Sequence, residues 1–141
     1  MGYTYDYPRP MVTVDMIVAR IHNSLAEILL IERGNTPFKG MWALPGGFVD
    51  MDEDLQDAAH RELKEETSLV VDELSQFKTF AKPGRDPRGR TVSVVFHGKV
   101  DYQCSAVKNG DDAADARWFD VNQLPELAFD HALIVKDFLD H

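Results

Sequence analysis

The sequence predicts a single α+β domain. The chain has 141 residues, of which 44% are hydrophobic, and this is the size of one domain with one core. Strand-like apolar runs occur in both halves, and two other segments have helical periodicity. No repeat or low-complexity segment divides the chain. We therefore expect one domain over residues 1–141, with an N-terminal arm over residues 1–10.

Five segments have the composition of β-strands. Apolar and β-branched residues dominate the first two, which a short segment separates, so they predict a strand pair. In the fourth, Val92, Val94 and Phe96 alternate with polar residues. The five segments are residues 11–20, 26–33, 77–81, 90–100 and 114–121.

The first helix is predicted after residue 54. Leu55, Ala58, Ala59 and Leu63 recur at i, i+3, i+4 and i+8. The acidic residues 52–54 precede them and suit the positive end of the helix dipole.

The last segment, residues 130–141, predicts the second helix. Asp130 is expected to cap this helix, with His131 in its first turn. Its apolar residues lie largely at helical spacing: Leu133, Ile134, Val135, Phe138 and Leu139.

The composition argues against several kinds of partner. Lys and Arg total 15 against 24 Asp and Glu, giving a net charge of −9, so we expect no nucleic acid and no membrane as partners. The only cysteine, Cys104, has no second cysteine for an internal disulfide, and residues 1–10 lack a signal-peptide pattern. These features predict a cytoplasmic protein.

Three glutamates gather at the C-terminal end of the first predicted helix. Glu62, Glu65 and Glu66 stand at i, i+3 and i+4 and share one face. Each like-charge pair costs a few tenths of a kcal/mol, and each conflict with the helix dipole costs about 0.3–1 kcal/mol. Arg61 and Lys64 offset part of this cost. A solvated acidic face is one interpretation, and a site for hard divalent cations such as Mg²⁺ is the other.

The residues around this face resemble the Nudix box. Gly47 is followed after five residues by Glu53, and after seven more by "RELKEETSL", residues 61–69. The resemblance implies an α/β/α sandwich with a central mixed β-sheet, in which "GMWALPGG" forms the strand and turn before the box. Ser68 stands where the family has glycine. If that position is a left-handed helix cap, serine costs about 1–2 kcal/mol there.

The resemblance to the Nudix hydrolase family also implies a reaction. It implies hydrolysis of a nucleoside diphosphate derivative with Mg²⁺ (or Mn²⁺) as cofactor. The implied metal ligands are Glu62, Glu65, Glu66 and the backbone carbonyl of Gly46, with Gly47 beside the substrate. Glu53 and Arg61 are implied as supporting residues. An acidic protein needs such ions to hold a diphosphate.

The general base is left open between two places. Glu66 is one candidate. An acid of the loop "NGDDAAD" is the other, and there Asp112 is favoured over Asp111 and Asp115.

A basic segment after the box bears on the substrate. Residues 78–90 contain five cations and one acid, and "GRDPRGR" resembles a stretch of ADP-ribose pyrophosphatases and of bifunctional nicotinamide mononucleotide adenylyltransferases. Arg85, Arg88 and Arg90 are therefore expected to bind the substrate phosphates, although an ordinary solvated hairpin has the same composition. The leading expectation is hydrolysis of ADP-ribose to AMP and ribose 5-phosphate.

Three alternatives stay open. The first is a nucleoside triphosphate substrate of the 8-oxo-dGTP type. The second is a non-catalytic ADP-ribose sensor, as in Nudix-related transcriptional regulators; the intact box acids argue against it, as does the lack of a winged-helix segment after His141. The third is a scaffold whose activity has drifted, for which Ser68 is the only sign.

Aromatic residues outside the box have two expected roles. Trp42 and Trp118 lie in apolar surroundings and are expected in the core. Tyr3, Tyr5 and Tyr7 are expected to contact a second copy of the chain in a homodimer, as is common among ADP-ribose pyrophosphatases. Packing on the same domain and stacking on adenine are the alternatives for these tyrosines.

Overall fold

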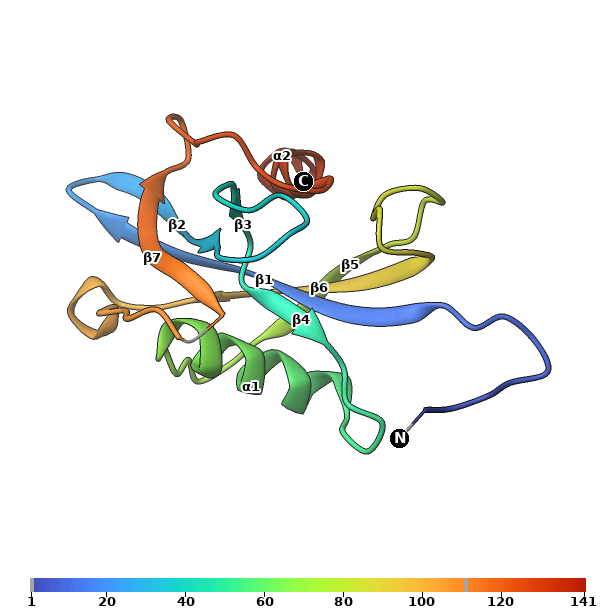
Figure 1. Cartoon of the computed structure of the whole chain (residues 1–141). Coiled ribbons are helices and arrows are strands. Elements are labelled where there is room, and N and C mark those ends of the chain that lie inside the picture. The colour runs from blue at the N-terminus through green and yellow to red at the C-terminus, as the bar shows by residue number, and fades with distance from the viewer. Residues whose placement is uncertain (1, 111) are drawn as a thin grey trace.

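A mixed seven-stranded sheet lies between two helices in the computed structural model, which describes residues 2–110 and 112–141 (Figure 1). The strands are β1 (Met11–His22), β2 (Leu25–Arg33), β3 (Trp42–Ala43), β4 (Gly46–Phe48), β5 (Ser75–Phe80), β6 (Thr91–Lys99) and β7 (Ala113–Asp120). The helices are α1 (Leu55–Thr67), α2 (His131–Asp140) and the short 3₁₀ helix η1 (Tyr102–Cys104).

Strand β1 organises the sheet. It pairs in parallel with β6 from Met11↔Thr91 to Ala19↔Lys99, whereas β2, β3, β5 and β7 join by antiparallel pairing. On its other side β1 changes partner: residues 19–22 pair with β2, and residues 13–15 pair with β4. The sheet is therefore split beside the first half of β1, and the candidate site lies at this split.

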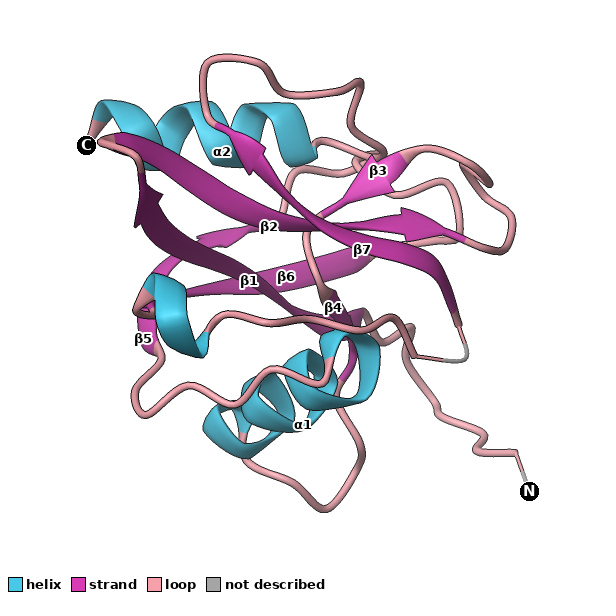
Figure 2. Ribbon diagram, turned by 90° about the vertical axis from the view of Figure 1, so that its left-hand side faces the viewer, coloured by secondary structure: helices cyan, strands magenta, loops and turns pink. Residues whose placement is uncertain are grey.

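The two faces of the sheet carry different helices, as Figure 2 shows. Alternate residues of β1 point to opposite faces, as in any strand. Val14, Met16 and Val18 share a buried cluster with the α1 residues Ala58, Ala59 and Leu63. Ile17 shares another with Ile134 and Val135 of α2. The predicted fold class, an α/β/α sandwich with a central mixed β-sheet, is confirmed.

The β1–β2 hairpin is tighter than expected. Both strands extend into residues 21–25, which were expected to separate them. This leaves a two-residue turn at Asn23 and Ser24. Their φ angles are 52° and 66°, and positive φ at both central residues is the pattern whose twist matches a β-hairpin.

Helix α1 has the ends that its sequence predicts. At its start the Asp54 carboxylate accepts a hydrogen bond from the backbone N–H of Leu55 at 2.7 Å. At its end Ser68 has φ 64° and donates its N–H to the carbonyl of Lys64 at 2.9 Å. Ser68 is thus a left-handed cap, the conformation that favours the glycine it replaces.

Helix α2 corrects one expectation. Asp130 precedes the helix but makes no side-chain capping hydrogen bond. Its carboxylate instead binds the guanidinium of Arg85 at 2.7 and 2.9 Å, because the charged partner offers two donors where a helix N–H offers one. Among the residues placed by the structure, no helix has the length and apolar character needed to cross a membrane.

The two tryptophans are partly buried and pack against the core, in line with the expectation. Trp118 packs against the α1-side cluster and donates its indole N–H to the carbonyl of Ser105 at 2.8 Å. Trp42 packs against the α2-side cluster and meets Phe119 edge-on.

Candidate active site

The acidic face of α1 borders a cleft of about 530 Å³ at the split in the sheet. The wall opposite α1 comes from β2 and from the loops around it. The residues that line this outer part of the cleft are Ile31, Arg33, Gly34, Asn35, Gly46, Gly47, Phe48, Asp50, Glu62, Glu65, Glu66, Arg88 and Asp112. All three predicted glutamates and both glycines of the predicted turn therefore share one cleft.

Glu66 is tied to strand β4. Its carboxylate oxygen Oε1 accepts the backbone N–H of Gly46 at 2.6 Å. Burial raises the pKa of Glu66 to about 8, against the opposing effect of this hydrogen bond, and the nearby carboxylates of Glu62 and Asp15 raise it further. The end of α1 thus presents a buried carboxylate that an added positive charge would stabilise.

Glu62 lies against Gly47. A Cβ atom at position 47 would stand 2.5 Å from the Glu62 carboxyl carbon and 2.6 Å from its oxygens. Only glycine leaves room for the carboxylate at the β4 backbone. Burial raises the pKa of Glu62, and the guanidinium of Arg61 acts in the opposite direction.

Arg61 joins the acidic loop, β4 and α1. It binds both carboxylate oxygens of Glu53 at 2.5 and 2.9 Å, and it donates to Glu62 at 2.9 Å and to Glu65 at 3.2 Å. It also reaches the carbonyl of Phe48 at 3.2 Å. Hydrogen bonds from Arg61 and from the backbone N–H of Asp50 lower the pKa of Glu53 to about 2. The contacts of Arg61 are those of a residue that fixes the geometry of the loop and the helix.

The donor set fits a hard divalent cation. Within residues 2–110 and 112–141, no three His, Cys, Asp or Glu side chains form a ready-made metal cluster, since Arg61 draws Glu62 and Glu65 to itself. The chemistry nevertheless suits Mg²⁺ or Mn²⁺, because the acids supply oxygen ligands and Glu66 is buried beside other carboxylates. The space left by the missing side chain of Gly47 keeps the Glu62 carboxylate at the cleft.

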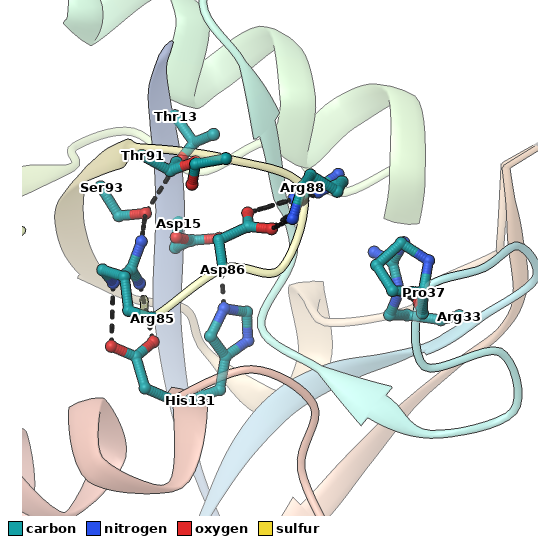
Figure 3. Close-up of polar contacts among 12 residues, drawn as sticks. Thr13, Asp15, Arg33, Pro37, Arg85, Asp86, Arg88, Thr91, Ser93 and His131 are labelled. Carbon is teal, nitrogen blue, oxygen red and sulfur yellow. Dashed lines mark hydrogen bonds and ion pairs between the residues drawn. The ribbon is translucent and has the colours of Figure 1, made fainter. Parts of the chain in front are cut away.

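The three arginines of the basic loop have different positions, and Figure 3 shows two of them, Arg85 and Arg88. Arg88 lines the cleft and pairs with Asp86 at 2.8 Å. The buried Arg85 binds Asp130 through two hydrogen bonds and Ser93 at 2.6 Å, so its guanidinium holds protein groups together. Arg90 donates to the carbonyl of Ala81 in the same loop and does not line the described cleft. The expectation that Arg90 binds substrate phosphates is therefore not supported by its position, because its guanidinium serves the loop backbone.

A narrow inner part of the cleft, about 60 Å³, continues from the outer part toward β1, β6 and α2. The buried Asp15 of β1 lies 3.8 Å from the ring of His131, whose Nδ1 accepts the backbone N–H of Leu44 at 3.0 Å. Burial raises the pKa of Asp15 and lowers that of His131. Both shifts favour the neutral forms of these two side chains.

Sequence reasoning missed Asp15, Arg33 and Phe129 as residues of the cleft. Asp15 gave one signal, since it is a carboxylate inside an otherwise apolar strand. Arg33 ends β2, and its Nε donates to the carbonyl of Pro37 at 2.7 Å. Nothing in the local sequence indicates that these residues meet, because β1, β2 and the segment before α2 are far apart in the chain.

The candidates for the loop base separate in the structure. Asp112 is exposed and lines the outer cleft. Asp115 is engaged by Arg117 at 2.6 Å and by the backbone N–H of Ala116 at 2.8 Å. Asp111 lies outside the described residues.

Comparison with known proteins agrees with this geometry. The family model described as NUDIX domain matches residues 9–139. The chain belongs to the Nudix family. An ADP-ribose pyrophosphatase of Methanocaldococcus jannaschii is 47% identical over 133 residues, which are 94% of this chain and 75% of that protein. The ADPR responsive transcriptional repressor NtrR of Acinetobacter baylyi is 38% identical over 89% of this chain, which spans 52% of the repressor.

Solved Nudix structures share the fold. The NUDIX domain of Shewanella oneidensis NrtR, complexed with ADP ribose, has a TM-score of 0.89 at 31% identity, covering 96% of this chain and 92% of that one. A bifunctional NMN adenylyltransferase/ADP ribose pyrophosphatase of Francisella tularensis, complexed with AMP and a manganese ion, has a TM-score of 0.82 at 32% identity. That match covers 96% of this Nudix chain and 43% of the bifunctional one.

Proposed function

We propose that this Nudix chain hydrolyses ADP-ribose to AMP and ribose 5-phosphate with Mg²⁺ or Mn²⁺. The observation that carries the proposal is the cleft in which Glu62, Glu65 and Glu66 face Arg33 and Arg88. Carboxylates that bind a divalent ion and arginines that bind phosphate are the two halves of a diphosphate site. The 47% identity to an ADP-ribose pyrophosphatase supports this choice of substrate.

Glu62, Glu65, Glu66 and the backbone carbonyl of Gly46 would hold the metal. When bound, the ion neutralises the diphosphate, polarises a phosphoryl oxygen and lowers the pKa of the attacking water. Water adds to one phosphorus as the bridging P–O bond breaks, so one phosphate leaves with adenosine and the other with ribose. Arg61 and Glu53 keep α1, β4 and the acidic loop in position during this step.

The attacking water loses its proton to a carboxylate, and two carboxylates of the cleft are candidates. Glu66 uses Oε1 to accept the Gly46 N–H, so Oε2 is the atom that we assign to take the proton. Asp112, at the outer edge of the cleft, is the second candidate.

We further propose that the chain forms a homodimer through its N-terminal arm. Residues 2–10 are exposed and extend away from the domain in Figure 1. Tyr3 stacks on Tyr5 with ring centroids 6.2 Å apart, and the guanidinium carbon of Arg9 lies 3.9 Å from the ring centre of Tyr5. Exposed aromatic rings are typical of interfaces. Sedimentation equilibrium should give twice the chain mass, and a Tyr3→Ser/Tyr5→Ser/Tyr7→Ser variant should give the monomer mass. A monomeric wild type would contradict the dimer.

The direct test of function is a panel assay with Mg²⁺ and then Mn²⁺. ADP-ribose, 8-oxo-dGTP and NADH are offered, and product release is followed for wild type and Glu66→Gln. We expect preferred turnover of ADP-ribose that falls at least about 1,000-fold in Glu66→Gln, since a metal ligand is lost. Asp57→Asn, on the same helix but outside the cleft, is the matched control and should keep wild-type turnover.

Three results would contradict the proposal in different ways. Preference for 8-oxo-dGTP would keep the metal site but change the substrate. Binding of ADP-ribose without turnover would indicate a sensor. Near-normal activity of Glu66→Gln, with folding checked by circular dichroism, would show that the reaction does not depend on a metal held by Glu66.

A further inference from the structure

Aromatic rings and guanidinium groups alternate along one wall of the cleft. The guanidinium carbon of Arg88 lies 4.8 Å from the ring centre of Phe48 and 5.0 Å from that of Phe129. The guanidinium carbon of Arg33 lies 5.0 Å from the ring centre of Phe129. These contacts are within the range of cation–π attraction. We call the series Phe48, Arg88, Phe129 and Arg33 the ladder.

Hydrogen bonds made in the guanidinium planes fix the ladder. Arg88 donates from Nε and Nη2 to Asp86 at 3.1 and 2.8 Å, and Arg33 donates from Nε to Pro37 at 2.7 Å. A guanidinium that donates through its edge keeps its faces for stacking. Figure 3 shows the Arg88 side chain bound to Asp86 and the Arg33 side chain beside Pro37.

Unusual backbone conformations support the middle of the ladder. Phe129 has φ 54° and Phe38 has φ 61°, values that bulky residues seldom adopt. The two rings meet edge to face at 4.8 Å between centroids. Such conformations persist only where the surrounding structure imposes them, and they concentrate at ligand sites.

Phe48 is the member of the ladder that remains open. It follows Gly47 directly, lines both parts of the cleft and is 40% exposed. We infer that the free surface of the Phe48 ring receives the nucleobase of a nucleoside phosphate whose phosphates lie at Gly46, Gly47 and the glutamates. The assignment of that base as adenine rests on the proposed function; the stacking itself depends only on the ladder.

The aromatic character of Phe48 determines which half of the substrate it binds. Stacking on an aromatic ring serves every base, because every base has a π face. Phe48 therefore supplies affinity for the nucleoside half of the substrate and contributes nothing to the sugar phosphate on the other side of the diphosphate. The products of the proposed reaction, AMP and ribose 5-phosphate, separate these two halves.

Calorimetric titration of the full chain with AMP and with ribose 5-phosphate, in Mg²⁺ buffer, tests the inference. Phe48→Ala should weaken AMP binding about 5- to 150-fold, the range of one base–aromatic stack, and leave ribose 5-phosphate within about twofold. Phe48→Trp should retain AMP binding. Phe48→Leu keeps apolar bulk without a π face and should lose most of the affinity for AMP, which separates stacking from support of the fold.

Tyr102→Ala is the matched control. Tyr102 is an exposed aromatic residue that lines a separate cavity of about 600 Å³ beside Arg20 and Lys99. Its loss should leave both titrations unchanged. Equal weakening of AMP and ribose 5-phosphate by Phe48→Ala, unchanged AMP affinity, or no AMP binding by the wild type up to millimolar concentration would each overturn the inference.

Steady-state kinetics distinguish this inference from the proposed function. If ADP-ribose is hydrolysed, Phe48→Ala should raise its KM while kcat stays within about threefold. Phe48-dependent AMP binding without ADP-ribose turnover would leave the ladder in place and reject the hydrolase. Turnover of ADP-ribose with an unchanged KM in Phe48→Ala would reject the ladder alone.

Discussion

Arg61 is the residue on which the arrangement of the acids depends. It donates to Glu53, Glu62 and Glu65 and to the carbonyl of Phe48, which come from three different parts of the chain. Without this guanidinium, the carboxylates would repel one another at the negative end of the α1 dipole. A single arginine thus offsets the negative charge of this acidic face without a bound cation.

The Glu53–Arg61 pair should make stability depend on pH. The folded state lowers the pKa of Glu53 to about 2, from an ordinary value of 4.5. A depressed carboxyl pKa stabilises the folded chain above the unfolded value, and this stabilisation is lost as the pH falls through 4.5 toward 2. Urea unfolding at pH 7, 4 and 3 should therefore show wild type more stable than Glu53→Gln at pH 7, with a difference that shrinks at pH 3. A difference independent of pH would mean that packing, and not charge, explains the effect.

Individual residues of the site were only partly predictable. The box residues Glu53 and Arg61 and the three glutamates occupy one short stretch, so their spacing alone places them together. Arg85 and Arg90 were expected at phosphates; Arg85 lines the inner part of the cleft with its guanidinium on Asp130 and Ser93, and Arg90 lies outside the described cleft with one donor on the carbonyl of Ala81. A sequence pattern identifies a cation, whereas the acceptor it meets depends on tertiary structure.

At the scale of elements, helix α1 ends with a conformational cost. Ser68 takes φ 64° with its N–H on the carbonyl of Lys64, and its hydroxyl makes only a long contact of 3.3 Å to Lys108. A left-handed conformation costs an L-residue with a Cβ about 1–2 kcal/mol. The helix therefore ends in the right place, although its cap residue is not the best one.

Ser68→Gly should stabilise the protein. Relief of the left-handed conformation exceeds the added flexibility of the unfolded chain, so we expect a gain of about 0.5–1 kcal/mol in the free energy of unfolding. Ser68→Ala removes the same hydroxyl but keeps Cβ, and should give no gain. Thermal and urea unfolding would measure both variants, and equal effects of Gly and Ala would show that the hydroxyl, not the backbone, matters.

The elements themselves followed closely from periodicity. All five predicted strands and both helices are present, with ends shifted by a few residues. The β1–β2 turn was harder to predict, because Asn23-Ser24 lacks the glycine that usually marks a two-residue hairpin. The short strands β3 and β4 were indicated only through the resemblance of "GMWALPGG", since two or three residues are too few for a periodic pattern.

At the scale of the whole molecule, an ion pair joins the loop between β5 and β6 to the start of α2. Arg85, in the loop between β5 and β6, binds Asp130 at the start of α2, with side-chain exposures of 4% and 19%. The same loop carries Asp86 and Arg88, which line the cleft. The position of α2 and the position of the basic loop are therefore coupled.

Arg85→Met should destabilise the protein by about 3–5 kcal/mol, because Asp130 would be left without its buried partner. Lys136→Met is the matched control, since Lys136 pairs with Asp140 at side-chain exposures of 74% and 63%. Exposed pairs contribute little, so this variant should stay within about 1 kcal/mol of wild type. Urea unfolding gives both values, and equal losses would show that the buried pair has no special weight.

The complete cleft could not have been assembled from the sequence. Asp15, Arg33 and Phe129 reach it only after β1, β2 and the segment before α2 have taken their places in the fold. These placements depend on pairings between residues many positions apart, for which local periodicity gives no signal. The box predicted the chemistry, and the tertiary structure supplied the wall opposite it.

The parallel pairing of β1 with β6 has a consequence for how the protein is made. Met11 meets Thr91, and Ala19 meets Lys99, so about 80 residues separate the two strands. During translation β1 therefore leaves the ribosome about 80 residues before β6, its parallel neighbour. Until β6 is made, the edge of β1 that it will pair with stays open, and open strand edges favour aggregation. The segment from β4 to the end of α1 is synthesised in this interval, whereas Asp112 and Phe129 of the cleft follow β6 in the chain, so the cleft is completed only after β6 has joined the sheet.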